Sequence, residues 1–131
     1  MKLNLTTPPV LRDVEFDGDS WFFRFSDEEW LRSGCLWRLL RNGHISFTSN
    51  DHGQLFGLSK PIDAVLLVTA SLAGKEVTSL GWDDETADLS VSLGDELWLQ
   101  LVADSSGYEA WELRIDGKRY IAQGGGTVIA V

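Results

Sequence analysis

The chain has 131 residues, a length that fits one domain, so we expect a single domain over residues 1–131. Its apolar content of 44% and charged content of 24% are ordinary for a soluble globular protein. Twenty acidic and eleven basic side chains give a net charge of −9, which disfavours nucleic acid and anionic membranes as partners. A basic protein partner fits this charge, although the charge could also serve solubility alone.

The chain has one cysteine, Cys35, which excludes an intramolecular disulfide and a zinc site built on several thiolates. A small buried hydrophobic side chain is its expected role. The N-terminal residues MKLNLTTPPVLRD lack the continuous apolar stretch of a secretory signal, and the longest apolar run, AVLLV, is too short to cross a bilayer. We therefore expect a cytoplasmic protein without a membrane segment, a metal or a cofactor.

The first part of the chain predicts strands joined by tight turns. Residues 1–9, which end in two prolines, are expected to form a loose leader. Residues 10–25 alternate partly in polarity around Asp17-Gly18, and a second pair of apolar runs flanks Asn42-Gly43. Both dipeptides favour hairpin turns.

Two helices are predicted. The segment SDEEW has the serine-to-glutamate spacing of a capping box, which favours a short helix at about 26–33. The segment KPIDAVLLVTASLAG predicts the main helix at about 61–73, with Pro61 in the first helical position and Gly74 just beyond the end. Helical spacing assigns one face to Ile62, Val65, Leu66, Thr69, Leu72 and Ala73.

After this helix the apolar period becomes two, and five segments follow that read as consecutive antiparallel strands. A three-residue loop at 94–96 would pair Leu93 with Leu97 and align the apolar faces of two of them. This register leaves Trp98 and Val102 on the opposite face, which we expect other elements to cover. The predicted fold class is α+β, with a twisted antiparallel sheet of about seven or eight strands.

The last strands contain polar and glycine-rich turns that resemble catalytic loops only in composition. A two-residue turn at Asp116-Gly117 would set Arg114 opposite Arg119, a repulsive pair unless Glu112 lies between them. The triple glycine at 124–126 leads into a β-branched run and not into a helix, so it predicts a turn or bulge, not a phosphate loop.

Few residues could support catalysis, and we assign no catalytic or metal-binding residue. Both histidines, His44 and His52, are expected in solvated loops, and with Asp51 they would form a small hydrolase only if all three converged in one pocket. The densest acidic cluster lies in WDDETAD, where the carboxylates bunch within a turn and do not alternate as in a calcium loop. A solvated hairpin tip is the usual meaning of such a cluster.

The second half of the chain carries the order LAGKEVTSLGW, ADLSVSL, ELWLQL, DSSGYEAWEL and GGGTV. This order resembles a group of small bacterial proteins of unknown function, some of which are encoded near polymorphic toxins and are proposed to be immunity proteins. The resemblance covers roughly residues 60–131. The matching residues are Leu72 to Gly74, Asp88-Leu89, Tyr108-Glu109, Trp111 and Gly124 to Gly126.

Charge and resemblance together favour a non-catalytic immunity-type protein that covers a basic toxin, since carboxylates can mimic the phosphates that a nuclease binds. The candidate contact residues are the four acids Asp83, Asp84, Glu85 and Asp88, with Trp98 as an aromatic anchor if its face of the sheet is exposed and not covered. One alternative is a structural domain that associates with itself as a homodimer. A second alternative is the hydrolase built on the two histidines.

Overall fold

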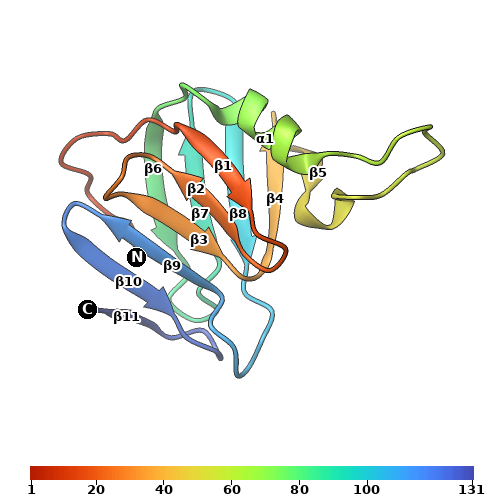
Figure 1. Ribbon diagram of the computed structural model, residues 1–131. Helices are drawn as coiled ribbons and strands as arrows, with labels where there is room; N and C mark the ends of the chain where they lie inside the picture. Colours follow the sequence, from red (N-terminus) through yellow and green to blue (C-terminus); the bar gives the residue numbers. More distant parts are fainter.

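The computed structural model describes residues 1–131 and contains two antiparallel sheets and one α-helix (Figure 1). The six-stranded sheet has the order β1-β2-β3-β9-β10-β11, and the five-stranded sheet has the order β5-β4-β8-β7-β6. The strands are β1 Asp13–Phe16, β2 Trp21–Arg24, β3 Trp30–Ser33, β4 Leu36–Arg41, β5 His44–Thr48, β6 Val77–Trp82, β7 Leu89–Leu93, β8 Leu97–Val102, β9 Trp111–Ile115, β10 Lys118–Ala122 and β11 Val128–Ala130.

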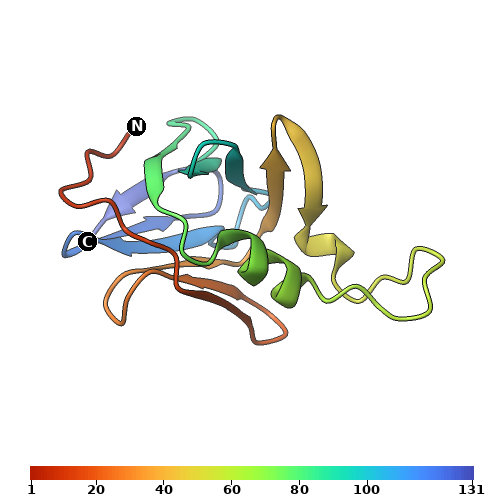
Figure 2. The same cartoon turned by 90° about the horizontal axis from the view of Figure 1, so that it is seen from above.

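The predicted combination of antiparallel strands with one main helix is confirmed, but the expected single sheet of seven or eight strands is wrong. Eleven strands form two sheets that pack face to face (Figures 1 and 2). Alternation along each strand explains the packing: β8 buries Leu97, Leu99 and Leu101 and turns Trp98 outward. One core cluster of 27 buried residues forms between the sheets.

The N-terminal segment is ordered, which corrects the expectation of a loose leader over residues 1–9. The Leu3 N–H donates to the Leu80 carbonyl oxygen at 2.9 Å, and the Val77 N–H donates to the Pro9 oxygen at 2.8 Å. Leu3 and Leu5 pack against the core. The segment therefore runs along β6, where it satisfies backbone groups that an edge strand would otherwise leave free.

The main helix, α1, spans Ala64–Leu72 and is shorter than the predicted 61–73. The helix does not begin at Pro61 as predicted. Asp63 is its N-cap, because the Asp63 carboxylate accepts a hydrogen bond from the Leu66 N–H at 3.0 Å. Gly74 takes its predicted place after the helix, with φ of +79°. The predicted apolar face is only partly right, since the buried stripe consists of Ala64, Val68 and Leu72.

The second predicted helix, at about 26–33, does not exist. The Ser26 hydroxyl oxygen does accept from the Glu29 N–H at 3.0 Å, as a capping serine would. The chain then enters β3, where Leu31 is fully buried and pairs with Phe23 on β2 and Leu113 on β9. Strand pairing on both sides therefore overrides a local signal that is compatible with a tight turn as well as with a helix.

The predicted hairpins are confirmed. Asn42-Gly43 joins β4 to β5 and Asp116-Gly117 joins β9 to β10, and all four residues have positive φ, as turns of type I′ require. Asp17-Gly18 lies in the turn between β1 and β2. The loop 94–96 pairs Leu93 with Leu97, which is the predicted register.

The C-terminal region also follows its prediction. Arg114 stands opposite Arg119, and the Arg119 Nε donates to the Glu112 carboxylate at 2.6 Å, which relieves the repulsion. Gly124 to Gly126 form a turn that leads into β11. Cys35 is buried, and desolvation raises the pKa of its thiol to about 11.

Candidate functional site

The predicted acidic residues lie in the turn between β6 and β7, which we call the acidic turn and define as residues 83–88. The Asp83 carboxylate accepts hydrogen bonds from the Glu85 N–H at 2.8 Å and the Thr86 N–H at 3.0 Å. These backbone donors lower the pKa of Asp83 below its ordinary value. The Ala87 N–H closes the turn on the Asp83 carbonyl oxygen at 2.9 Å. Asp83 therefore orders the turn that carries it.

Asp88 also has a structural role. Its carboxylate accepts a hydrogen bond from the Ala103 N–H at 2.9 Å, which ties the acidic turn to the chain that leaves β8. On another side, Gly126 lies so close to the backbone of Glu85 and Thr86 that a Cβ atom would collide with them. The acidic turn is thus fixed by its own hydrogen bonds and by two other loops.

Asp83, Asp84 and Glu85 are all exposed, but the carboxylates of Asp84 and Glu85 take no part in holding the turn. The Asp84 side chain is 78% exposed and lies 3.3 Å from the terminal ammonium of Met1. Glu85 is exposed, and its carboxylate makes no hydrogen bond within the chain. The predicted set of four acids therefore divides into two that hold the turn, Asp83 and Asp88, and two that remain available to a partner.

Sequence reasoning missed two acids that tertiary structure brings to the same end of the molecule. Asp104 shares one hollow with Glu85, Ser105 and Gly126, and it shares a second hollow with Asp19. Asp104 follows β8 and Asp19 lies in the turn between β1 and β2, so the two come from different sheets. The one available signal was that each lies in a polar turn, which does not reveal that the turns meet.

Trp98 is 47% exposed, so the expectation that other elements would cover it is wrong. It lies on the outer face of the five-stranded sheet, where it borders a shallow hollow with Met1, Lys2 and Ser90. Met1 connects this hollow to the acidic turn through its ion pair with Asp84. The predicted aromatic anchor and the predicted acids therefore border one continuous surface.

The three residues of the hydrolase hypothesis make separate contacts. His44 is exposed at the start of β5. His52 is half-buried, which corrects the expectation of a solvated loop: its Nδ1 accepts from the Ala64 N–H at 3.1 Å, and its ring meets Trp21 edge to face. The Asp51 carboxylate accepts from the Thr48 N–H at 2.9 Å. Both His52 and Asp51 thus bond backbone amides.

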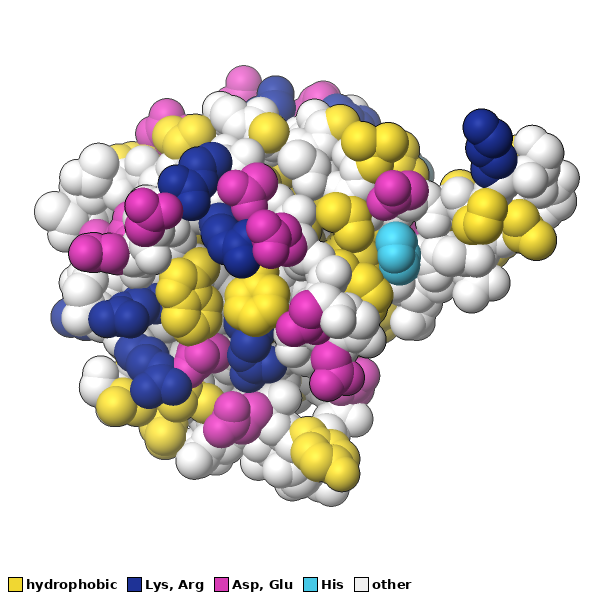
Figure 3. Space-filling view, viewed as in Figure 1, with side chains coloured by type: hydrophobic (Ala, Val, Ile, Leu, Met, Phe, Trp, Pro, Cys, Tyr) yellow, Lys and Arg dark blue, Asp and Glu magenta, His cyan; other side chains and the backbone are white.

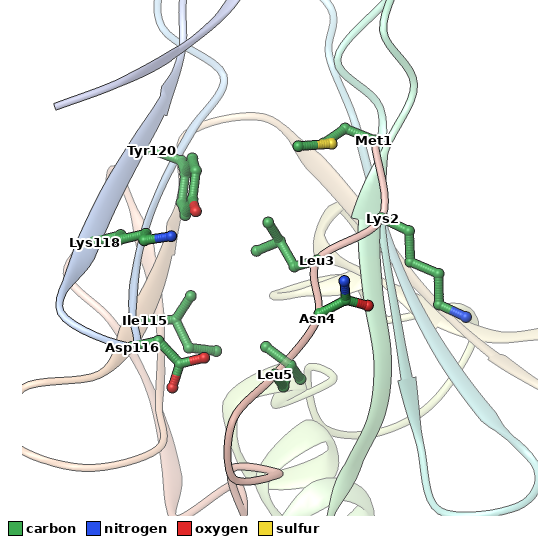
Figure 4. A pocket seen from close by; sticks show the side chains of 9 residues that line it. All are labelled: Met1, Lys2, Leu3, Asn4, Leu5, Ile115, Asp116, Lys118 and Tyr120. Atoms are coloured by element: carbon green, nitrogen blue, oxygen red, sulfur yellow. The ribbon is translucent and has the colours of Figure 1, made fainter.

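A hollow lies between the N-terminal segment and the hairpin of β9 and β10 (Figure 4). Figure 4 shows Leu3 and Leu5 directed toward Ile115 and Tyr120, while Lys2 points away. Its volume is about 220 Å³, and its apolar walls continue the core outward. No group of three or more His, Cys, Asp or Glu side chains is arranged to hold a metal ion anywhere in the chain.

The outer face of the six-stranded sheet intersperses charges of both signs (Figure 3). Arg24 pairs with Glu15 at 2.8 Å, and Arg119 pairs with Glu112. Such balanced, exposed pairs contribute little stability, and they leave no single-sign field on this face. The unbalanced negative charge at the acidic turn is therefore the more distinctive electrostatic feature.

Comparison with protein-family models, with curated proteins and with solved structures finds no significant match for this chain. The resemblance of residues 60–131 to immunity proteins remains a hypothesis drawn from sequence motifs. The one α-helix, α1, has nine residues, and no helix is both long and apolar enough to span a membrane.

Proposed function

We propose that the protein is a non-catalytic binding module of the toxin-immunity type, which acts in the cytoplasm by covering a basic surface on a protein toxin. The observation that carries this proposal is the ordered acidic turn, which presents Asp84 and Glu85 to solvent. Asp104 and Asp19 extend the negative charge into the adjoining hollows. Together these four residues define the acidic surface.

The internal hydrogen bonds of the acidic turn make it suitable for recognition. Because Asp83 and Asp88 already hold the backbone, a partner need not pay to order the loop when it binds. A net charge of −9 also attracts a basic partner over a distance and speeds encounter. Carboxylates in a fixed arrangement can occupy positions that a nuclease reserves for phosphate oxygens.

Trp98 supplies the apolar component of the same contact. A half-exposed Trp beside a shallow hollow is the kind of residue that dominates binding energy when a partner buries it. The carboxylates of the acidic surface then act at the rim of the contact, where they set encounter rate and specificity more than affinity. The two classes of residue therefore have separable effects on binding.

The test uses the protein product of the neighbouring open reading frame as the candidate toxin. Direct binding is measured by isothermal titration calorimetry, and protection is measured as growth during co-expression. We expect the double variant Asp84→Asn/Glu85→Gln to weaken binding at least tenfold, about 1.4 kcal/mol. Raising the salt concentration should reduce the difference in binding affinity between this variant and the wild type, because salt screens exposed charges.

A matched control removes the same charge elsewhere. Asp27→Asn/Glu28→Gln neutralises two exposed acids in the turn between β2 and β3 and should leave affinity almost unchanged. Equal weakening by both double variants would mean that only overall charge matters, and the assignment of the acidic turn would fail. Absence of binding to the neighbouring product, together with absence of protection, would count against the immunity function itself.

A further inference from the structure

An arm projects from the body of the molecule between β5 and α1 (Figures 1 and 2). We define it as residues 53–62, which follow a short 3-10 helix at Ser49–Asp51. Its tip exposes three large apolar side chains, Leu55, Phe56 and Leu58, with Phe56 67% exposed. Figure 3 shows hydrophobic side chains on the projecting arm, apart from the body of the molecule. An apolar cluster in this position indicates an interaction site.

The arm is ordered by its own hydrogen bonds. The Gly53 N–H donates to the Ile62 carbonyl oxygen, and the Ile62 N–H donates to the Gln54 carbonyl oxygen, each at 2.8 Å. At the base, the ring of His52 packs edge to face against Phe16 and Trp21 of the body. The apolar tip is therefore held away from the core, and little conformational entropy is lost when it binds.

Helix α1 follows the arm and is apolar on two faces. Its inner stripe is buried in the core, while Leu66 and Leu67 point outward and Leu66 is 66% exposed. A helix with apolar residues on both sides is normally covered on both sides. The protein supplies no cover for the outer face of α1, and the arm extends away from it (Figure 2).

The arm and α1 form an electrically neutral surface on a strongly negative protein. Residues 53–72 contain one basic side chain, Lys60, and one acidic side chain, Asp63, so their formal charge is zero. The rest of the chain accordingly carries the whole net charge of −9. The Asp63 carboxylate, moreover, caps the helix through the Leu66 N–H. A second copy can approach this surface without the repulsion that the acidic turn would cause.

We propose that this surface is a homodimer interface in which the arm tip of one copy packs on the outer face of α1 of a second copy, and the reverse contact forms at the same time. Each copy carries both halves of the contact, the tip and the helix face, so the two contacts can form together about a two-fold axis. The neutral charge disfavours the basic partner that we propose for the acidic turn. The arm and α1 lie apart from the turn between β6 and β7 (Figure 1), so this contact leaves the acidic turn free.

The expected contact is mainly apolar. Each copy contributes three side chains of the tip and two of the helix, and burial of apolar surface is the main favourable contribution to association. Lys60 lies beside the tip and, as the cation of this segment, is suited to the rim of the interface. Losing one apolar anchor should therefore be enough to weaken the dimer measurably.

Sedimentation velocity over a wide range of protein concentration tests the proposal. We expect the wild type to dimerise, and we expect Phe56→Ser and Leu66→Ser each to weaken dimerisation at least tenfold. Tyr108→Ser, which changes an 83% exposed aromatic residue in another loop, is the control and should leave the dimer unchanged. Far-UV circular dichroism verifies that each variant is folded.

Mixing the two variants gives a sharper test of the crossed contact. A mixed pair keeps one wild-type contact, between the tip of the Leu66→Ser copy and the helix of the Phe56→Ser copy. The mixture should therefore associate more tightly than either variant alone, as measured by fluorescence anisotropy of one labelled variant. A wild type that stays monomeric, or a dimer that the two substitutions do not weaken, would overturn the proposal. Binding of monomers to phosphatidylcholine vesicles would overturn it in favour of a membrane surface.

Discussion

The acidic turn and the arm are both exposed connections, yet they differ in what they expose and in how they are held. In the acidic turn, the carboxylates of Asp83 and Asp88 accept hydrogen bonds from backbone amides, and the other two carboxylates are presented to solvent. The arm is held by backbone hydrogen bonds and presents apolar side chains. Each loop is ordered before any partner arrives, so the two are suited to partners of different chemistry.

The difference also shows why exposure has different meanings in the two regions. Exposed carboxylates keep their hydration and need no further explanation. Exposed Leu and Phe side chains at the end of a projecting arm lack the favourable free energy that burial would contribute, and nothing in the chain covers them. The exposed apolar side chains of the arm therefore indicate a contact with another molecule more strongly than the acidic turn does. The acidic turn indicates instead that its partner is basic.

The largest predicted effect concerns the packing that fixes the acidic turn. Gly126→Ala should lower the free energy of unfolding by roughly 3 kcal/mol or more, because φ is +99° and the new Cβ would overlap the backbone of Glu85. Gly125→Ala is the matched control: φ is +89°, but the new Cβ would meet only the Ser106 oxygen, at an ordinary contact distance of 3.8 Å, so we expect a loss of about 1–2 kcal/mol. Urea unfolding measures both, and equal losses would show that the contact with Glu85 is unimportant.

A smaller effect should appear in the pH dependence of stability. The folded pKa of Asp83 is lowered by two backbone N–H donors, so its stabilising contribution is fully present above the ordinary value of 3.8. This contribution is lost as the pH falls through the lowered folded pKa. The stability difference between the wild type and Asp83→Asn should therefore shrink as the pH is reduced below 3.8.

Urea unfolding at a series of pH values measures the difference in the free energy of unfolding between Asp83→Asn and the wild type. A difference that stays constant as the pH falls below 3.8 would contradict the role of the Asp83 carboxylate in the acidic turn.

The smallest effect on stability is predicted for the arm tip. Phe56→Ser should change the free energy of unfolding of the monomer by no more than about 0.5 kcal/mol, because the side chain is exposed and contributes nothing to the core. Thermal unfolding at low protein concentration isolates the monomer. A large loss would show that the tip packs on its own body, and the contrast between the two loops would disappear.

Local sequence was a good guide wherever short-range geometry decides the outcome. Asn42-Gly43 and Asp116-Gly117 predict their turns because few residues tolerate positive φ. The register of Leu93 with Leu97 follows from aligning apolar faces across one turn. In the candidate site, the clustering of acids in one turn was visible, because the four residues are neighbours in sequence.

Tertiary contacts decided the remaining features. The Ser26 turn suits a helix or a strand, and pairing of Leu31 with two neighbouring strands selects the strand. The N-terminal segment looked loose because its partner, β6, lies more than seventy residues away, as the bond from Leu3 to Leu80 shows. Separation along the chain likewise concealed that Asp19 and Asp104 share one hollow and that Asp104 shares another with Glu85.

The sequence by itself therefore determined the turns, the strand alternation, the negative charge and the main helix. Only the tertiary structure decided that the strands divide into two sheets, that Asp83 and Asp88 have structural roles, and that the arm and the outer face of α1 remain uncovered. The physical reason is range: turn geometry and side-chain alternation act between near neighbours, whereas burial and hydrogen-bond partners depend on segments that meet only after folding.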